Sequence, residues 1–226
     1  MRRMLFPLFL GLGGIAILMS LGFWQLHRLE WKKTILANIA AQINKPPTDI
    51  AEIGDPDPVA QRYQPVKLSG KTLGAEILVL SGKKNDGAGY EVISAFETTG
   101  GRRILVDRGF IPEELRNVVR PPVALAITGN LDWPMETDSF TPPPDTKTGL
   151  WFARDVAKMA ENLRTDPLLV VVKQADGDTQ SIDPVPVDTS GIPNDHLQYA
   201  ITWFSLAGVW VGMTAYLLWR IRQRTT

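Results

Sequence analysis

The chain has 226 residues, enough for one domain together with membrane segments, and it carries 24 basic and 24 acidic side chains. It has no cysteine, which excludes disulfides, thiolate metal sites, covalent c-type haem attachment and cysteine nucleophiles. All 24 acidic residues lie between Glu30 and Asp195, whereas six of the basic residues lie outside that segment. The middle of the chain is therefore acidic, which argues against nucleic acid as a partner, because nucleic-acid-binding domains present a concentrated basic patch.

The first apolar run covers residues 4–26 and contains 23 residues without a formal charge. As a helix it would be about 34 Å long, and the hydrocarbon core of a bilayer is about 30 Å thick. A secretory signal peptide would have a shorter apolar core, of about 7–15 residues, and a small-x-small cleavage site, which is not visible here. We therefore predict a retained transmembrane helix at residues 4–26, after a cytoplasmic N-terminus at residues 1–3.

The middle of the chain has the pattern of a small β domain. The first helix is expected to continue from residue 30 to about residue 44, where two prolines end it. Strand signals follow, in which β-branched and aromatic residues alternate between turn residues. The predicted strands are residues 63–69, 76–81, 90–96, 103–110, 124–131 and 168–173, and one short helix is predicted at residues 155–163. A Thr-Gly-Gly turn joins the third and fourth strands as a hairpin, so the pattern predicts a mostly antiparallel sheet or barrel carrying one helix.

Charged residues occur on and around these predicted strands. We expect them to be solvated strand and turn charges; they are Arg102, Arg103, Asp107, Arg108, Glu113 and Glu114. No phosphate-binding glycine loop, zinc-type spacing or nucleophile elbow accompanies them, so they do not by themselves predict a catalytic site.

A second uncharged run, residues 197–219, predicts another transmembrane helix, with residues 220–226 as a cytoplasmic basic tail. Asp195 occupies the position of an N-cap before this helix. Because arginines flank the outer end of each span, the positive-inside rule places both termini in the cytoplasm and residues 27–195 in the periplasm. No Arg- and Ser-rich transit peptide precedes the first span, which favours the inner membrane of a bacterium over a mitochondrion. The predicted fold class is an α+β membrane protein, in which N- and C-terminal transmembrane helices flank a periplasmic, mostly antiparallel β domain with a short helix.

His196 is one of two histidines in the chain and stands at the start of the second span, at the membrane boundary. Three interpretations are open: a polar anchor at the interface, a general base, or an axial ligand to haem iron. A general base needs a partner group, and residues 28–195 contain no histidine that could complete a serine triad. The positive pole of the helix disfavours the imidazolium form and leaves a ring nitrogen free to bind iron, which favours the ligand role.

The residues around His196 are suited to a flat ligand. Within about 60° of it on the second helix, Ala200 and Ala207 are small and leave room, while Tyr199 and Trp203 offer flat apolar surface. The alternative for these aromatic residues is the interfacial belt of Trp and Tyr that is common in membrane proteins.

The edge of the first span that should meet this region carries Trp24, His27 and Arg28. Arg28 could bind an anionic group such as a haem propionate, although snorkelling to lipid headgroups is its commoner role. His27 could be a second iron ligand.

Small residues suggest where the two spans pack. Gly208 and Gly212 form a GxxxG pair on the second helix, and such spacing lets membrane helices approach closely. Gly11, Gly14 and Gly22 could supply the other side of the contact.

Three stretches of the sequence are similar to a known family. They are residues 21–26 (Leu-Gly-Phe-Trp-Gln-Leu) with Arg28, Trp31 and Lys32; residues 106–112 (Val-Asp-Arg-Gly-Phe-Ile-Pro), with residues 151–155 as a weaker companion; and residues 196–204 (His-Leu-Gln-Tyr-Ala-Ile-Thr-Trp-Phe). On these stretches, and on the two-span layout, the chain resembles the Surfeit locus protein 1 family, membrane assembly factors for haem–copper cytochrome c oxidase. The resemblance covers nearly the whole chain.

The resemblance implies a role in maturing oxidase subunit I, in which the histidine matching His196 binds haem a, or another haem. Our first hypothesis is a haem a chaperone rather than an enzyme, with His196 on the iron and with Tyr199, Trp203, Trp24 and Arg28 around the cofactor. Its implied partners are subunit I, haem a synthase and membrane lipid. The alternative is a membrane scaffold that stabilises a subunit I assembly intermediate without binding haem. A membrane-anchored periplasmic enzyme is disfavoured by the histidine-free middle segment.

Overall fold

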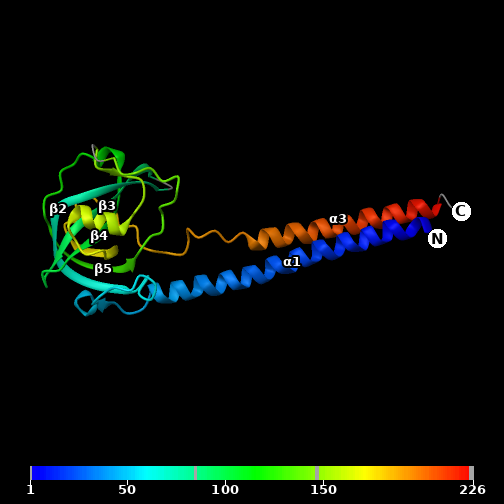
Figure 1. Ribbon diagram of the computed structural model, residues 1–226, viewed down its shortest axis with the longest axis horizontal. Helices are drawn as coiled ribbons and strands as arrows, with labels where there is room; N and C mark the ends of the chain where they lie inside the picture. Colours follow the sequence, from blue (N-terminus) through cyan, green and yellow to red (C-terminus); the bar gives the residue numbers. More distant parts are fainter. Residues whose placement is uncertain (1, 84–85, 146–147, 224–226) are drawn as a thin grey trace. The chain divides into compact units, whose positions relative to one another are not determined.

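The computed structural model describes residues 2–83, 86–145 and 148–223 of the chain. The chain divides into two compact units, one made of Met1–Asn38 with Thr189–Thr226 and the other of Ile39–Asp188. The first unit is helical and the second is mostly sheet, as the ribbon in Figure 1 shows.

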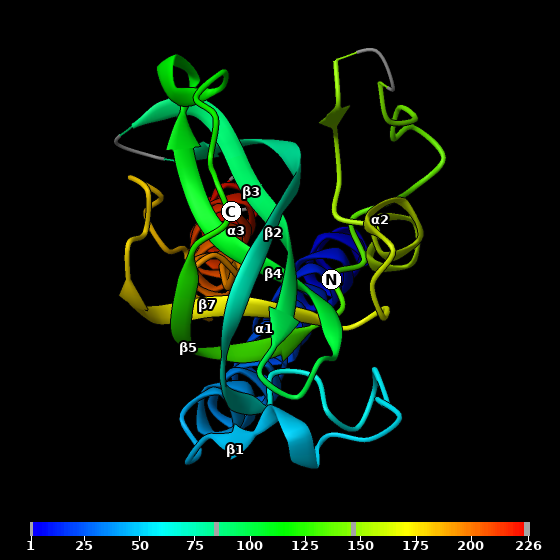
Figure 2. The ribbon, with the colours of Figure 1, turned by 90° about the vertical axis from the view of Figure 1, so that its left-hand side faces the viewer.

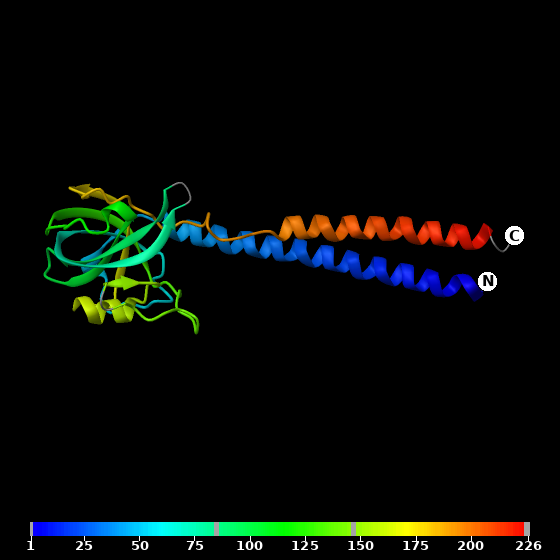
Figure 3. The same cartoon turned by 90° about the horizontal axis from the view of Figure 1, so that it is seen from above.

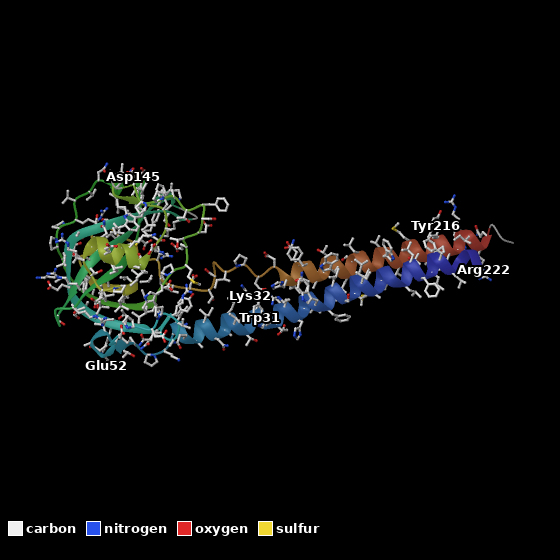
Figure 4. The ribbon with its side chains drawn as sticks, viewed as in Figure 1. Trp31, Lys32, Glu52, Asp145, Tyr216 and Arg222 are labelled. Atoms are coloured by element: carbon white, nitrogen blue, oxygen red, sulfur yellow. The ribbon has the colours of Figure 1, made fainter. Side chains whose placement is uncertain are left out.

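Two long helices make up the helical unit: α1 (Arg2–Ile43), of which the last turn belongs to the other unit, and α3 (His196–Gln223). They run antiparallel and lie side by side in the views of Figures 1 and 3. Both are long and apolar enough to cross a membrane. The predicted extension of the first helix beyond residue 30 is confirmed, because α1 continues without a break to Ile43. Basic residues end α3, and Figure 4 shows Arg222 near its C-terminal end.

Glycines on α1 make the close contact between the two helices. A Cβ atom at Gly11, Gly14 or Gly22 would overlap the side chains of Thr214, Trp210 and Phe204, respectively. The indole Nε1 of Trp210 also donates a hydrogen bond of 3.1 Å to the carbonyl of Gly11. The contribution that we expected from these three glycines is therefore confirmed.

The prediction that these glycines pack against the GxxxG pair on α3 is wrong. A Cβ atom at Gly208 or Gly212 would meet nothing within 4 Å, so neither glycine faces α1. The larger residues of α3 fill the hollows that the α1 glycines leave, and a second glycine surface is not needed for the helices to approach.

The sheet unit is a closed barrel. Its main strands are β2 (Pro65–Lys83), β3 (Gly87–Thr98), β4 (Arg103–Pro112), β5 (Ala124–Asp132) and β7 (Leu169–Gly177). They pair in the order β2-β3-β4-β7-β5, and β5 pairs with β2 to close the ring, which Figure 2 shows curving round a common interior. The pairing is antiparallel except between β4 and β7, and two-residue strands β1 (Thr48–Asp49) and β6 (Leu150–Trp151) add parallel pairs to β2.

The long strand β2 pairs with two neighbouring strands along its length. Its residues 65–71 pair with β5, and its residues 70–83 pair with β3. The register shifts between Thr72 and Glu76, and Gly74 in this bulge has φ +77°, a conformation that glycine adopts without strain. The bulge bends the strand, so that one strand can close the barrel.

The predicted elements agree with this barrel except at β2. The sequence pattern places two strands at residues 63–69 and 76–81, where the structure has one continuous bent strand. The other four predicted strands correspond to β3, β4, β5 and β7. The predicted short helix is α2 (Val156–Leu163), and the Asp155 carboxylate caps it by accepting the backbone N–H of Lys158 at 3.2 Å. Two one-turn helices complete the unit: η1 (Ile50–Glu52) and η2 (Glu113–Leu115).

Candidate functional site

The candidate site lies where His196, the first residue of α3, meets α1. Its ring is partly buried, and its Nδ1 lies 2.8 Å from Oε1 of Gln25. Gln25 is 9% exposed, on the face of α1 that also buries Gly22 and Leu29. Among the described residues this is the one hydrogen bond that the His196 side chain makes. The imidazole is therefore held against the neighbouring helix rather than turned away from it.

The face of α3 that carries His196 is turned towards α1. One and three turns further along the helix, Ala200 is 1% exposed and Ala207 is 3% exposed. The expectation that these small residues leave room for a ligand is therefore wrong, because α1 occupies the space beside them. A flat ligand on His196 would have to lie on a flank of the helix pair.

Helical geometry gathers the predicted site residues on one such flank. Gln25 and His196 are the residues that meet across the two helices. In an antiparallel helix pair, residues that follow such contact residues by the same number of positions lie on the same side of the pair. Arg28 and Tyr199 each follow a contact residue by three positions, so they lie on the same flank. Trp24 lies about 40° further round α1 on that side, at about 100° per residue. Tyr199 is 55% exposed and Trp24 is 54% exposed, so both present aromatic surface.

Trp203 and Arg28 are two other predicted site residues on these helices. Trp203 is half-buried, close to the line of contact between the helices. Arg28 is also half-buried, and its guanidinium carbon lies 4.2 Å from the ring centroid of Trp31, a cation–π contact. Arg28 is thus already placed against an aromatic ring on the flank where an anionic group would be needed.

His27 is not brought to this flank. It follows Gln25 by two positions, which is about 200° round α1, and its side chain is exposed. It therefore points away from the contact with α3, and its role as a second iron ligand stays a prediction without support from the helix geometry.

A second cluster, in the barrel unit, was missed by the sequence reasoning. Arg154 lies at its centre: Nη1 is 3.1 Å from Oδ2 of Asp107 and 3.3 Å from Oε2 of Glu91, and the guanidinium also pairs with Glu136. The Asp107 side chain is 2% exposed. Burial, helped by the nearby Glu91 charge, raises the pKa of Asp107 to about 7, although Arg154 acts to lower it.

The prediction that Asp107 and Arg108 are solvated strand charges is wrong. Arg108 is 4% exposed and donates hydrogen bonds to Oε1 of Gln180 at 2.9 Å and to the carbonyl of Thr179 at 3.1 Å. Burial lowers the pKa of the Arg108 guanidinium. Both residues lie in the stretch 106–112 that carries the family resemblance, which was the one signal that could have marked them. Arg103, by contrast, is exposed as expected.

The cluster around Arg154 does not form a metal site. Among the described residues, no group of three or more histidine or carboxylate side chains is arranged to hold a metal ion. Arg154 instead ties β3, β4 and the loop before β6 together through three carboxylates. The cluster therefore links three segments of the barrel unit through ion pairs.

Comparison with known proteins agrees with the stretches that the sequence singled out. The model of the SURF1 family matches residues 12–208. A SURF1-like protein of Rickettsia felis is 32% identical over 206 residues, which cover 85% of this chain and 88% of that protein. Surfeit locus protein 1 of Xenopus tropicalis is 27% identical over 222 residues, covering 88% of this chain and 70% of that protein, and the protein of the same name from Rattus norvegicus is 26% identical over 239 residues, covering 93% and 74%. Since the matched region contains the candidate site residues of both helices and the whole barrel, the chain belongs to the SURF1 family.

Proposed function

We propose that this chain binds haem a through His196 and helps to deliver it to subunit I of cytochrome c oxidase. Membership of the SURF1 family implies a role in the assembly of that oxidase. The observation that carries the finer proposal is the placement of His196: an imidazole held by a hydrogen bond at one nitrogen, beside exposed aromatic side chains on the same flank. In this account, haem a synthase supplies the cofactor, subunit I receives it, and no chemical turnover is needed.

The proposed setting is the inner membrane of a bacterium. Its support is the pair of apolar helices and the arginines at the outer ends of both predicted spans, which favour cytoplasmic termini and a periplasmic barrel. His196 would then lie at the periplasmic edge of the bilayer, where lipid contacts the outer surface of both helices. Insertion of single reporter fusions after residue 45 and at the C-terminus would test this orientation.

The residues present fit a haem, whose iron would take an axial imidazole ligand from this chain. Nδ1 of His196 is engaged by Gln25, which leaves Nε2 for the iron. Tyr199 and Trp24 offer flat apolar surface beside it, and Arg28 supplies a cation for a propionate. What the protein contributes is orientation of the imidazole and an apolar, partly water-excluding surface.

The proposal is tested by purifying the full chain from cells that make haem a and measuring the haem-to-protein ratio and the optical spectrum. We expect His196→Ala to lose most of the bound haem. The matched control is Gln198→Ala, which removes a polar side chain from the same turn, about 200° round α3 from His196, and should keep the haem. Equal haem in His196→Ala and the unaltered protein would reject His196 as the ligand.

One observation favours a second function, a scaffold that stabilises an intermediate of subunit I without haem. Ala200 and Ala207 are 1% and 3% exposed, and side chains of α3 pack against the glycines of α1, so protein covers the contact face itself. A scaffold would co-purify with subunit I and carry no stoichiometric haem. His196→Ala would then leave co-purification unchanged.

A further inference from the structure

We propose that Gln25 is a positioning residue for the haem ligand, which fixes the proton of His196 on Nδ1 and so keeps Nε2 available for iron. This inference rests on the proposed function and names a residue to which the family resemblance gives no role. The two residues are 171 positions apart and meet because α1 and α3 pack side by side.

The hydrogen bond sets the tautomer of the ring. The Gln25 atom that faces Nδ1 is the amide oxygen, Oε1, at 2.8 Å, and an amide oxygen accepts hydrogen bonds but cannot donate them. Nδ1 must therefore carry the proton, and a neutral imidazole protonated at Nδ1 has its lone pair on Nε2. With the amide reversed, its NH₂ group would donate to Nδ1 and select the opposite tautomer. In that tautomer Nε2 carries the proton and has no lone pair for a metal. The orientation of one amide thus decides whether His196 can bind iron without first moving a proton.

The packing around Gln25 holds this geometry in place. Gln25 is 9% exposed and lies on the buried face of α1, three positions after Gly22. A Cβ atom at Gly22 would lie 2.5 Å from the ring of Phe204, so the missing side chain allows the close approach of the helices at this level. On α3, Ala200 is 1% exposed, so the first turn of α3 is covered on the face that meets α1.

A hydrogen-bond acceptor on the second ring nitrogen has known effects on a metal-bound histidine. It orients the ring and raises the basicity of the ligating nitrogen, and its removal typically lowers metal affinity about 10–100-fold. An apolar residue at position 25 would remove this effect without harming a helix in lipid. Glutamate would keep an acceptor at the same reach, and its charge would strengthen the effect.

The first arm of the test uses the haem-free full chain in lipid bilayers. With ¹⁵N-labelled histidine, solid-state NMR distinguishes a protonated from an unprotonated ring nitrogen, and comparison with His196→Ala identifies the His196 signals because the chain has two histidines. We expect protonated Nδ1 and unprotonated Nε2 in the unaltered chain and in Gln25→Glu, and a mixture of tautomers in Gln25→Leu. Protonated Nε2 in the unaltered chain, or no change in Gln25→Leu, would overturn the inference.

The second arm uses the same variants titrated with haem a and, separately, with haem b. We expect Gln25→Leu to bind haem about 10–100-fold more weakly, with a lower iron–histidine stretching frequency in the reduced state by resonance Raman, and we expect Gln25→Glu to restore both. A merely structural role would not lower that frequency in Gln25→Leu and restore it in Gln25→Glu. Circular dichroism of each variant establishes that the helices and barrel are formed.

The two arms separate this inference from the proposed function. Haem binding that survives in His196→Ala would overturn both. If His196→Ala loses haem while Gln25→Leu keeps the affinity and the stretching frequency of the unaltered protein, the proposed function stands and the role of Gln25 is refuted.

Discussion

Replacement of Arg154 by leucine should destabilise the barrel in a strongly pH-dependent way. The guanidinium faces Glu91 and Asp107 in the barrel wall, and the Asp107 side chain is 2% exposed. Removing one partner of a buried ion pair typically costs about 3–5 kcal/mol, because the remaining charge is left without compensation. We expect a loss of that size in the free energy of unfolding at pH 8.

The expected loss is smaller in acid because Asp107 takes up a proton there. Its pKa in the folded protein is about 7 and its ordinary value is 3.8, so between these values the folded state binds more protons than the unfolded chain. The contribution of this group to the free energy of unfolding therefore falls as pH rises from about 4 to about 7, by about 1.4 kcal/mol per pH unit. Arg154 acts to lower this pKa, so in Arg154→Leu the fall should continue above pH 7. At pH 5, where Asp107 is neutral in both proteins, the loss should shrink to about 1–2 kcal/mol, which comes from the broken contacts of Arg154 with Glu91 and Glu136.

The measurement is urea unfolding of the full chain in detergent at pH 5, 6, 7 and 8, followed by far-ultraviolet circular dichroism. The matched control is Arg103→Leu, which breaks an exposed ion pair with Glu97 of 3.8 Å and should cost less than about 1 kcal/mol at every pH. A loss in Arg154→Leu that is as large at pH 5 as at pH 8, or no larger than that of Arg103→Leu, would refute the reasoning.

Two further predictions concern packing. Gly22→Leu should weaken the association of α1 and α3 by about 1–3 kcal/mol, because the new side chain would overlap Phe204. Gly208→Leu should be close to neutral, because a Cβ atom there meets nothing within 4 Å. Unfolding in mixed detergent micelles compares the two variants, and equal losses would contradict this packing. Asn130→Ala should lower the free energy of urea unfolding by about 1–3 kcal/mol, because Asn130 is 1% exposed and its amide donates to two backbone carbonyls. The control, Lys173→Ala on the neighbouring strand, should change that free energy little. No loss in Asn130→Ala would show that the two carbonyls do not need this donor.

The arrangement of the fold was largely predictable from the sequence because its signals are local. Apolar runs give the two helices, and alternating residues between turns give four of the five main barrel strands. The failure at β2 also has a local cause: residues 70–75 contain two glycines and polar residues, a composition typical of a break, yet here they form a bulge that bends one strand. Bulges and turns favour the same residue types. They differ in which strands pair around them, and those strands lie far away in the chain.

The site was predictable only in part, because its contacts join distant segments. His196 could be found from its place at the start of an apolar helix. Gln25, 171 positions earlier, gives no sign by itself that its side chain meets that histidine. The same holds for Asp107, whose burial depends on Arg154 47 positions later. Charged residues on a strand are solvated unless such a partner neutralises them, and sequence spacing does not reveal the partner.

The central claim, that His196 is the haem ligand of this chain, is tested most directly by optical titration of haem a into the haem-free full chain in lipid nanodiscs. We expect saturable, stoichiometric binding with the spectrum of a histidine-ligated haem in the unaltered protein and in Gln198→Ala, and loss of that spectrum in His196→Ala. Binding of the same strength with the same spectrum in His196→Ala, or no saturable binding to the unaltered chain, would contradict it and leave the scaffold function in its place.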